Sequence, residues 1–131
     1  MGLDNSIEIK RNEHSNNIYD MIRRFEAPWD TKHEYDFEVV YFRKCWNIRQ
    51  LIANCLDVFV ECGNTPLNDY DILNIIDALK GITADNWDYN EGSVWTYEEQ
   101  EENIQQSIED LEYLYELMQH HDLDVYFYDS Y

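Results

Sequence analysis

The stretch FEVVYFRKCWNIRQLI, residues 37–52, changes from the pattern of a strand to that of a helix within a few residues. Its first six residues are β-branched or aromatic apart from Glu38, which favours a strand over 37–42. From Arg43 onward the apolar residues step by four, three, four and three, as on one helical face: Ile48, Ile52, Cys55, Phe59 and Cys62. We therefore expect a central helix over 43–62 that ends at Gly63.

Two further helices are predicted on the C-terminal side of this stretch. Asn68 is a good N-cap for a helix over 69–80, and Gly81 is a natural stop. Thr96 and Glu99 form a capping box that opens a helix over 97–120. The apolar seam of that long helix comprises Ile104, Ile108, Leu111, Tyr115 and Met118.

The two ends of the chain show the alternation that is typical of half-buried strands. Ile7 and Ile9 alternate with polar residues in 6–11, and Val125 and Phe127 do so in 123–128. Together with the strand at 37–42, they predict an α+β fold: one domain over 1–131, with a small antiparallel or mixed sheet covered by three helices. Residues 12–35 are less patterned, and only a short helical stretch around 18–25, ended by Pro28, is expected there.

The negative charge lies almost entirely in the C-terminal part of the chain. The formal net charge is −19, and residues 51–131 hold nineteen Asp and Glu against Lys80 alone. Such a field repels nucleic acid and anionic membranes and attracts basic surfaces. No apolar run reaches 18 residues. We therefore predict a cytoplasmic protein that binds neither nucleic acid nor membrane directly.

The sequence contains no recognisable catalytic, cofactor-binding or metal-binding motif. The four glycines form no phosphate-binding loop, and the four histidines sit in no local motif. The three cysteines are odd in number and lack a C-x-x-C pair, which favours free thiols, with Cys55 and Cys62 facing the core. We expect no enzyme activity, no cofactor and no metal.

The acidic face of the long helix and the loop before it are the candidate partner-binding residues. They are Glu98, Glu102, Glu109, Glu112 and Glu116 on the helix, with Asp85, Trp87, Asp88, Tyr89 and Glu91 in the loop. Carboxylates one helical turn apart are about 5–6 Å apart, close to the spacing of successive phosphates, so the face could imitate nucleic acid. An acidic face that is simply solvated is the alternative interpretation, and an apolar aromatic contact surface is a third.

Several features occur together that resemble a known group of proteins. They are MGLD at the start, EVVYFRKCWNIRQLI at 38–52, an acidic helix preceded by Trp95, and a terminal aromatic strand. The combination resembles a family of short, uncharacterised phage and prophage proteins with a Tyr-Trp-Arg-Lys stretch, here Tyr41, Phe42, Arg43 and Lys44. Phe42 departs from that stretch, and residues 12–35 have no counterpart in the family.

The resemblance implies a setting in the bacterial cytoplasm during infection. By analogy with small acidic phage proteins such as anti-CRISPR proteins, it predicts an inhibitor of a host nucleic-acid-binding defence protein, with a CRISPR effector as one candidate. The partner would present a basic surface, and the inhibitor would be a monomer or homodimer. The alternative is a phage accessory or structural protein that binds through apolar aromatic residues.

The basic residues of the opening stretch raise a separate question. Arg43 and Lys44 would begin the central helix, where positive charge opposes the helix dipole. We expect acids such as Glu38, or those of the long helix, to pair with them as an internal clamp. The alternative is a contact surface for a partner's carboxylates.

Overall fold

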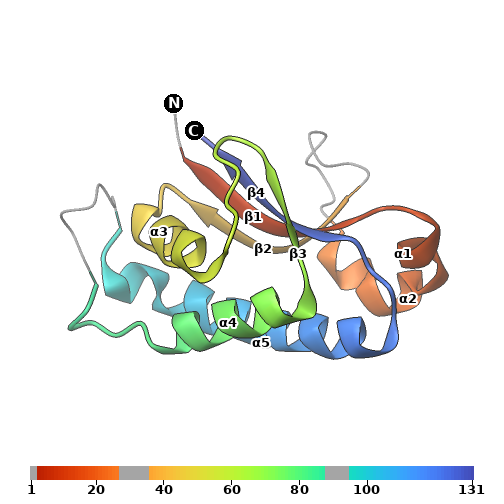
Figure 1. Cartoon of the computed structure of the whole chain (residues 1–131). Coiled ribbons are helices and arrows are strands. Elements are labelled where there is room, and N and C mark those ends of the chain that lie inside the picture. Colours follow the sequence, from red (N-terminus) through yellow and green to blue (C-terminus); the bar gives the residue numbers. More distant parts are fainter. Residues whose placement is uncertain (1–2, 27–35, 88–94) are drawn as a thin grey trace.

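The computed structural model describes residues 3–26, 36–87 and 95–131. Its strands are β1 (Asp4–Lys10), β2 (Asp36–Arg43), β3 (Asn64–Leu67) and β4 (Val125–Ser130). Its helices are α1 (Glu13–Asn17), α2 (Tyr19–Ile22), the 3-10 turn η1 (Arg23–Phe25), α3 (Trp46–Cys55), α4 (Asp69–Lys80) and α5 (Tyr97–His120). The strands form one antiparallel sheet in the order β2-β1-β4-β3, so the predicted α+β class is confirmed (Figure 1).

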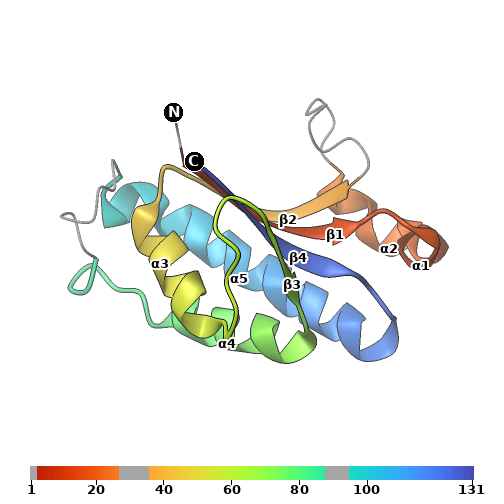
Figure 2. The ribbon, with the colours of Figure 1, turned by 45° about the horizontal axis from the view of Figure 1, so that its top comes forward.

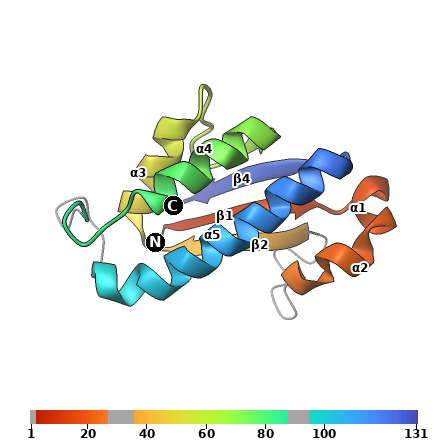
Figure 3. The ribbon, with the colours of Figure 1, turned by 90° about the horizontal axis from the view of Figure 1, so that it is seen from below.

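The larger helices cover one face of this sheet. In Figures 1 and 2, α3, α4 and α5 lie on the same side of the strands. Seen from that side, α5 runs diagonally across β1 and β2, and α4 lies between α5 and α3 (Figure 3). The short helices α1 and α2 sit at one end of the sheet. The two terminal strands pair with each other, and β1 is therefore an inner strand.

The helices that the capping residues predict form where expected. Asn68 accepts a hydrogen bond from the Asp71 amide (2.8 Å) and caps α4, which ends at Lys80 with Gly81 as C-cap. Thr96 accepts from the Glu99 amide (3.2 Å), and the Glu99 carboxylate accepts in return from the Thr96 amide (3.0 Å). Because these bonds satisfy amides that a helix leaves unpaired, they define both starts locally.

The prediction of one helix over 43–62 is wrong at both ends. Arg43 is still in β2, and Lys44 has φ of 52°, so α3 begins only at Trp46. It ends at Cys55, and Leu56 is extended. The chain then turns toward the sheet, where the Val60 amide donates to Thr65 Oγ1 (2.9 Å). The heptad-like spacing of Phe59 and Cys62 was therefore coincidental, because tertiary pairing replaces the helix there.

Strand β3 was not predicted, and Cys62 lies outside the core. The four residues of β3 pair with β4 at the edge of the sheet, where Pro66 is tolerated because an edge strand does not need every amide. Cys62 is exposed, Cys55 half-buried and Cys45 buried. The expectation that Cys55 and Cys62 share one buried helical face is thus wrong for Cys62.

The region before β2 contains more helix than the sequence indicates. Asn12 caps α1 by accepting from the Ser15 amide (3.0 Å), a start that the sequence analysis missed. The helical stretch expected around 18–25 corresponds to α2 and η1, and Glu26 is already extended. Pro28, the expected stop, lies outside the described residues.

One apolar core fills the space between the sheet and the helices. Its most buried members are at most 2% exposed: Ile7, Ile9, Phe37, Phe42, Ile48, Ile52, Ile72, Ile75, Leu79, Ile104, Leu111, Leu114 and Phe127. On α5 the buried positions shift from the expected seam to Leu114 and Leu117, while Tyr115 and Met118 are only half-buried. Leu111, Leu114 and Leu117 follow one another in steps of three, which is shorter than the 3.6-residue turn, so the buried face winds around α5 toward its C-terminal end. Across the described ranges, no helix has the length and apolarity needed to cross a bilayer.

Candidate functional site

The exposed face of α5 carries the five helical acids that the sequence analysis selected. The buried face of α5 is anchored by Ile104, Ile108, Leu111, Leu114 and Leu117, and it fixes the rotation of the helix. All five acids are exposed: Glu98, Glu102, Glu109, Glu112 and Glu116. At 100° per residue they fall within a quarter-turn of one another, and they extend over about 27 Å of helix axis.

Among the described residues, two ion pairs and one histidine–carboxylate contact border this acidic face. Lys80 Nζ lies 3.4 Å from Glu112 Oε2, and His120 Nε2 lies 3.3 Å from Glu116 Oε1. Arg24 Nη2 donates to Asp110 Oδ1 at 2.5 Å, which ties α5 to the turn η1. Exposed pairs of this kind contribute little free energy, about 0–1 kcal/mol each. A partner's cationic surface could therefore replace these side chains beside the carboxylates at a small cost in free energy.

The loop residues predicted as partner contacts differ in their exposure. Asp85 is exposed, whereas the Trp87 side chain is only 6% exposed and packs in the core. The Trp87 indole donates from Nε1 to the Trp95 carbonyl (3.0 Å), and its ring meets Tyr97 edge-on with centroids 6.2 Å apart. Trp87 thus joins the turn at 81–87 to the start of α5 and presents little surface to a partner. Asp88, Tyr89 and Glu91 lie outside the described residues.

Arg49 makes a buried clamp that the sequence pattern did not single out, and the pairing predicted for Arg43 and Lys44 stays a prediction. Arg49 Nε and Nη2 donate to the two carboxylate oxygens of Asp129 at 2.8 and 3.0 Å. The Cys62 amide (3.0 Å) and Asn5 Nδ2 (2.6 Å) donate to the same carboxylate. The Arg49 side chain is 9% exposed and that of Asp129 0%, so this is a buried, bidentate pair between α3 and β4.

Three aromatic rings surround the Arg49 guanidinium, and its partner Asp129 has a shifted pKa. The Arg49 guanidinium lies 4.9–5.2 Å from the ring centroids of Trp46, Phe59 and Tyr131. Burial raises the pKa of Asp129, but the hydrogen bonds from Arg49, the Cys62 amide and Asn5 outweigh it, so the pKa is lowered overall. Asp129 therefore stays ionised at neutral pH.

The sequence did contain a signal for this pair. Asp129 continues the period-two set of Val125 and Phe127, so it falls on the buried face of the terminal strand. Arg49 likewise lies between the buried Ile48 and Ile52 on α3. Buried charges need partners, so these two residues could have been matched by charge.

The sheet also holds a polar cluster around Tyr126. The Tyr126 hydroxyl lies 3.2 Å from Glu8 Oε1 and contacts Asp36 Oδ2, while Ser6 Oγ contacts Glu8 Oε2. Burial and these acceptors raise the pKa of Tyr126, so the phenol keeps its proton at physiological pH. Within the part of the chain that the structure covers, no three His, Cys, Asp or Glu side chains are arranged to hold a metal.

Comparison with known proteins adds no assignment to this geometry, because no protein-family model, curated protein or solved structure matches the chain.

Proposed function

We propose that the protein is a phage-encoded acidic inhibitor that binds the basic nucleic-acid-binding surface of a host defence protein. The observation that carries this proposal is the row of exposed carboxylates along α5, from Glu98 to Glu116. The row spans about 27 Å on a helix that is fixed by its buried face. A rigid row of negative charges presents to a basic groove what a nucleic-acid backbone presents.

The electrostatics favour a protein partner over other ligands. Residues 97–120 contain eight Asp and Glu and no Lys or Arg, within a chain of net charge −19. The neighbouring cations Lys80 and Arg24 are themselves about half-exposed, so solvent screens them. Association with a basic surface should therefore be fast and sensitive to salt. The mechanism would be steric and electrostatic blocking without catalysis.

The proposed contact surface is the α5 row extended by Asp85. Asp85 is exposed within the turn at 81–87 that follows α4, and this turn is held by Asn86, whose Nδ2 donates to the Gly81 carbonyl (2.8 Å). Trp87 is left out because its indole is buried. Because Trp87 is buried, it cannot serve as an aromatic contact for a partner. This removes part of the support for the alternative, an accessory protein with an apolar aromatic interface.

The bacterial setting rests on the resemblance of residues 38–52 and the chain start to phage and prophage proteins. It places the partner in the host cytoplasm and makes a nucleic-acid-handling defence protein, such as a CRISPR effector, the first candidate. A monomer suffices for this mechanism because all the proposed contacts lie on one chain.

The test is affinity capture from a bacterial lysate on the immobilised protein, followed by elution with duplex DNA. A partner held through its nucleic-acid-binding surface should be released by DNA and by raising the salt from about 50 to 200 mM. The triple variant Glu109→Lys, Glu112→Lys, Glu116→Lys should capture at least tenfold less of it.

A matched triple variant controls for the change in net charge. Glu13, Asp20 and Asp57 are exposed acids outside the α5 row, and their replacement by lysine changes the net charge equally. This control should retain capture. Equal losses in both triple variants, or partners that DNA does not release, would refute the mimicry. Capture that persists at high salt would favour the accessory-protein alternative.

A further inference from the structure

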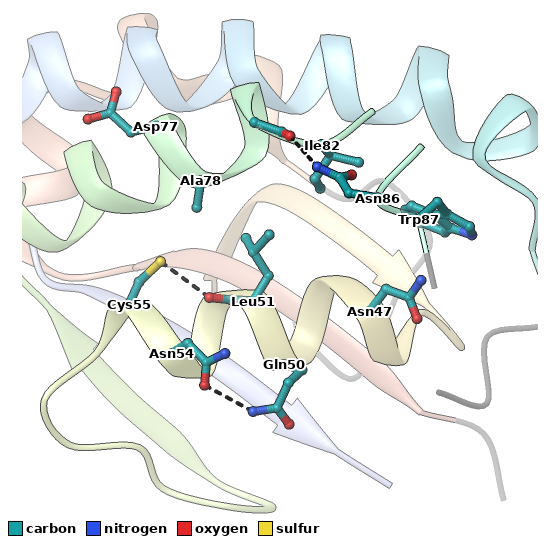
Figure 4. Close-up of a pocket in the computed structure, with 11 residues that line it drawn as sticks. Asn47, Gln50, Leu51, Asn54, Cys55, Asp77, Ala78, Ile82, Asn86 and Trp87 are labelled. Carbon is teal, nitrogen blue, oxygen red and sulfur yellow. Dashed lines mark hydrogen bonds between the residues drawn. The ribbon is translucent and has the colours of Figure 1, made fainter. Parts of the chain in front are cut away.

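The groove between α3 and α4 has a volume of about 620 Å³ but contains little that would select a ligand (Figure 4). Gln50 Nε2 donates to Asn54 Oδ1 (3.0 Å) on the side of α3 that faces away from α4, so these two amides bind each other. Among the described residues that line the groove, only Asp77 is charged, and its carboxylate points away from α3. A second cavity, at the sheet, is lined by charged groups that are fixed in place.

This second cavity, of about 540 Å³, lies where β1 ends and where β2 and β4 begin. Lys10 and Asp36 line it, and each is next to a buried core residue of its strand, Ile9 and Phe37. Because side chains alternate between the two faces along a strand, Lys10 and Asp36 lie on the face opposite to α3, α4 and α5 (Figures 1 and 2). The volume of the cavity falls in the range of sites that bind small molecules.

Two carboxylates of the cavity are held in place by neutral donors. Asp36 accepts hydrogen bonds from the Arg11 backbone amide (3.3 Å) and from the Tyr126 hydroxyl. Asp124 accepts from Asn12 Nδ2 (2.7 Å). An amide or a hydroxyl orients a carboxylate without cancelling its charge. Both negative charges therefore remain available to a ligand.

Lys10 supplies a positive charge that the described part of the protein does not use. It lies directly opposite Asp36 in the β1–β2 register, a position in which opposite charges attract each other. Asp36 binds the Tyr126 hydroxyl instead, and within the described ranges the Lys10 ammonium has no ion-pair or hydrogen-bond partner. The Lys10 backbone amide donates to the Asp124 carbonyl (2.8 Å), which places Asp124 beside β1 on the side of β4. Lys10 thus lies between two fixed carboxylates and pairs with neither.

Separate positive and negative groups are the complement of a zwitterion. An α-amino acid offers a carboxylate to the Lys10 ammonium and an ammonium to the Asp36 carboxylate, through charge-assisted hydrogen bonds. The described lining has one basic and two acidic residues, so a second cation on the ligand would meet Asp124. Asp36 and Asp124 flank β1 from its two sides, with their backbones about 10 Å apart. A side chain with the four-carbon stem of lysine is long enough to bridge them.

We propose that this cavity binds a small basic amino acid such as free lysine. The α-carboxylate of the ligand binds Lys10, its α-ammonium binds Asp36, and its side-chain ammonium binds Asp124. The carbon stem packs against Pro66 and Tyr126, which lie opposite each other in β3 and β4. The site is on the face of the sheet opposite to α5, so it does not depend on the proposed function of the acidic row.

NMR titration of the ¹⁵N-labelled full chain tests the site, with the backbone amides of Lys10, Asn64 and Tyr126 as reporters. L-Lysine is compared with n-pentylamine, which has the same net charge but lacks the α-amino-acid group, and with L-norleucine, which lacks the side-chain ammonium. All titrations are run at one pH and one ionic strength. Lysine should cause saturable shifts and bind about threefold to fivefold more tightly than either analogue, as expected for the loss of a partly exposed ion pair.

Two lysine variants show whether Lys10 recognises the carboxylate. Lys10→Met should bind lysine about threefold to fivefold more weakly, whereas its binding of n-pentylamine should not weaken. Lys80→Met changes the net charge equally at an exposed lysine outside the cavity and should bind lysine as the parent does. Because Lys10 is exposed as well, both variants should fold, and an otherwise unchanged spectrum would verify this.

Four results would overturn the proposal. They are the absence of saturable shifts with lysine, an analogue that binds the parent as tightly as lysine does, a Lys10→Met protein that binds lysine as tightly as the parent, and equal weakening in Lys10→Met and Lys80→Met. The last result would show a general effect of net charge, without recognition in the cavity.

Discussion

The buried pair of Arg49 and Asp129 makes a quantitative prediction about stability. The substitution Asp129→Asn keeps the size of the side chain but removes the charge that faces the guanidinium. In the parent protein this carboxylate accepts four hydrogen bonds, two from Arg49 and one each from the Cys62 amide and Asn5. The amide has a single acceptor oxygen, and Arg49 would remain charged with its side chain only 9% exposed.

Leaving a buried charge without its partner costs about 3–5 kcal/mol. We take the lower end, about 3 kcal/mol, because Glu61 Oε1 lies 4.0 Å from Arg49 Nη2 and supplies a weak substitute. For a chain of 131 residues, the unfolding entropy converts this loss into a fall in Tm of about 11 °C. Such a loss is a large part of the roughly 5–15 kcal/mol that holds a typical domain folded.

Urea denaturation followed by circular dichroism would measure the free energy of unfolding of four proteins. They are the parent, Asp129→Asn, Arg49→Met and the double variant. Because the double variant has no unpaired charge, its loss should be smaller than the sum of the single losses by about 1.5–3 kcal/mol. Asp57→Asn, at an exposed acid, should change stability by less than about 0.5 kcal/mol. A loss below about 1 kcal/mol for Asp129→Asn, or additive single losses, would refute this account.

Three further predictions concern acidity, capping and the loop. Because the pKa of Asp129 is lowered by folding, the stability advantage of the parent over Asp129→Asn should be present at neutral pH. It should be lost as the pH falls below about 3.9 and through the folded pKa, as urea titrations at several pH values would record. Asn68→Ala removes the cap of α4 and should cost about 1 kcal/mol by the same assay; no measurable loss would contradict the capping role. Trp87→Ala should lower the free energy of unfolding by about 3–5 kcal/mol. The control Tyr70→Ala, at a side chain that is 67% exposed, should change it very little. A Trp87→Ala protein as stable as the parent would show that the indole is not part of the core.

Much of the candidate site follows from short-range signals in the sequence. The capping box at Thr96 and Glu99 places the start of α5, and helical spacing then puts Glu98, Glu102, Glu109, Glu112 and Glu116 on one side. The amphipathic pattern alone also places those acids away from the core, which their exposure confirms. No long-range contact is needed for either inference, because helix caps and helical faces depend on residues within a few positions.

The loop residues and the groove could not be found in the same way. Trp87 looks like an exposed anchor in a polar loop, yet its indole is buried against Trp95 and Tyr97. The groove exists because α3 and α4 lie side by side, and the sequence contains no signal for the width between two helices. Burial of a loop residue depends on which elements approach it, and that is a property of the whole fold.

By itself, the sequence determined the class of the fold, the two helices that begin at Asn68 and Thr96, and the strands at both ends of the chain. Only the tertiary structure decided that α3 stops at Cys55, that β3 pairs with β4, and that Arg49 meets Asp129. The physical reason is the distance along the sequence between the residues that interact. Capping and periodicity act over one or two turns and can be read locally, whereas the clamp joins residues 80 positions apart. Such a contact forms only once the order of strands has brought them together.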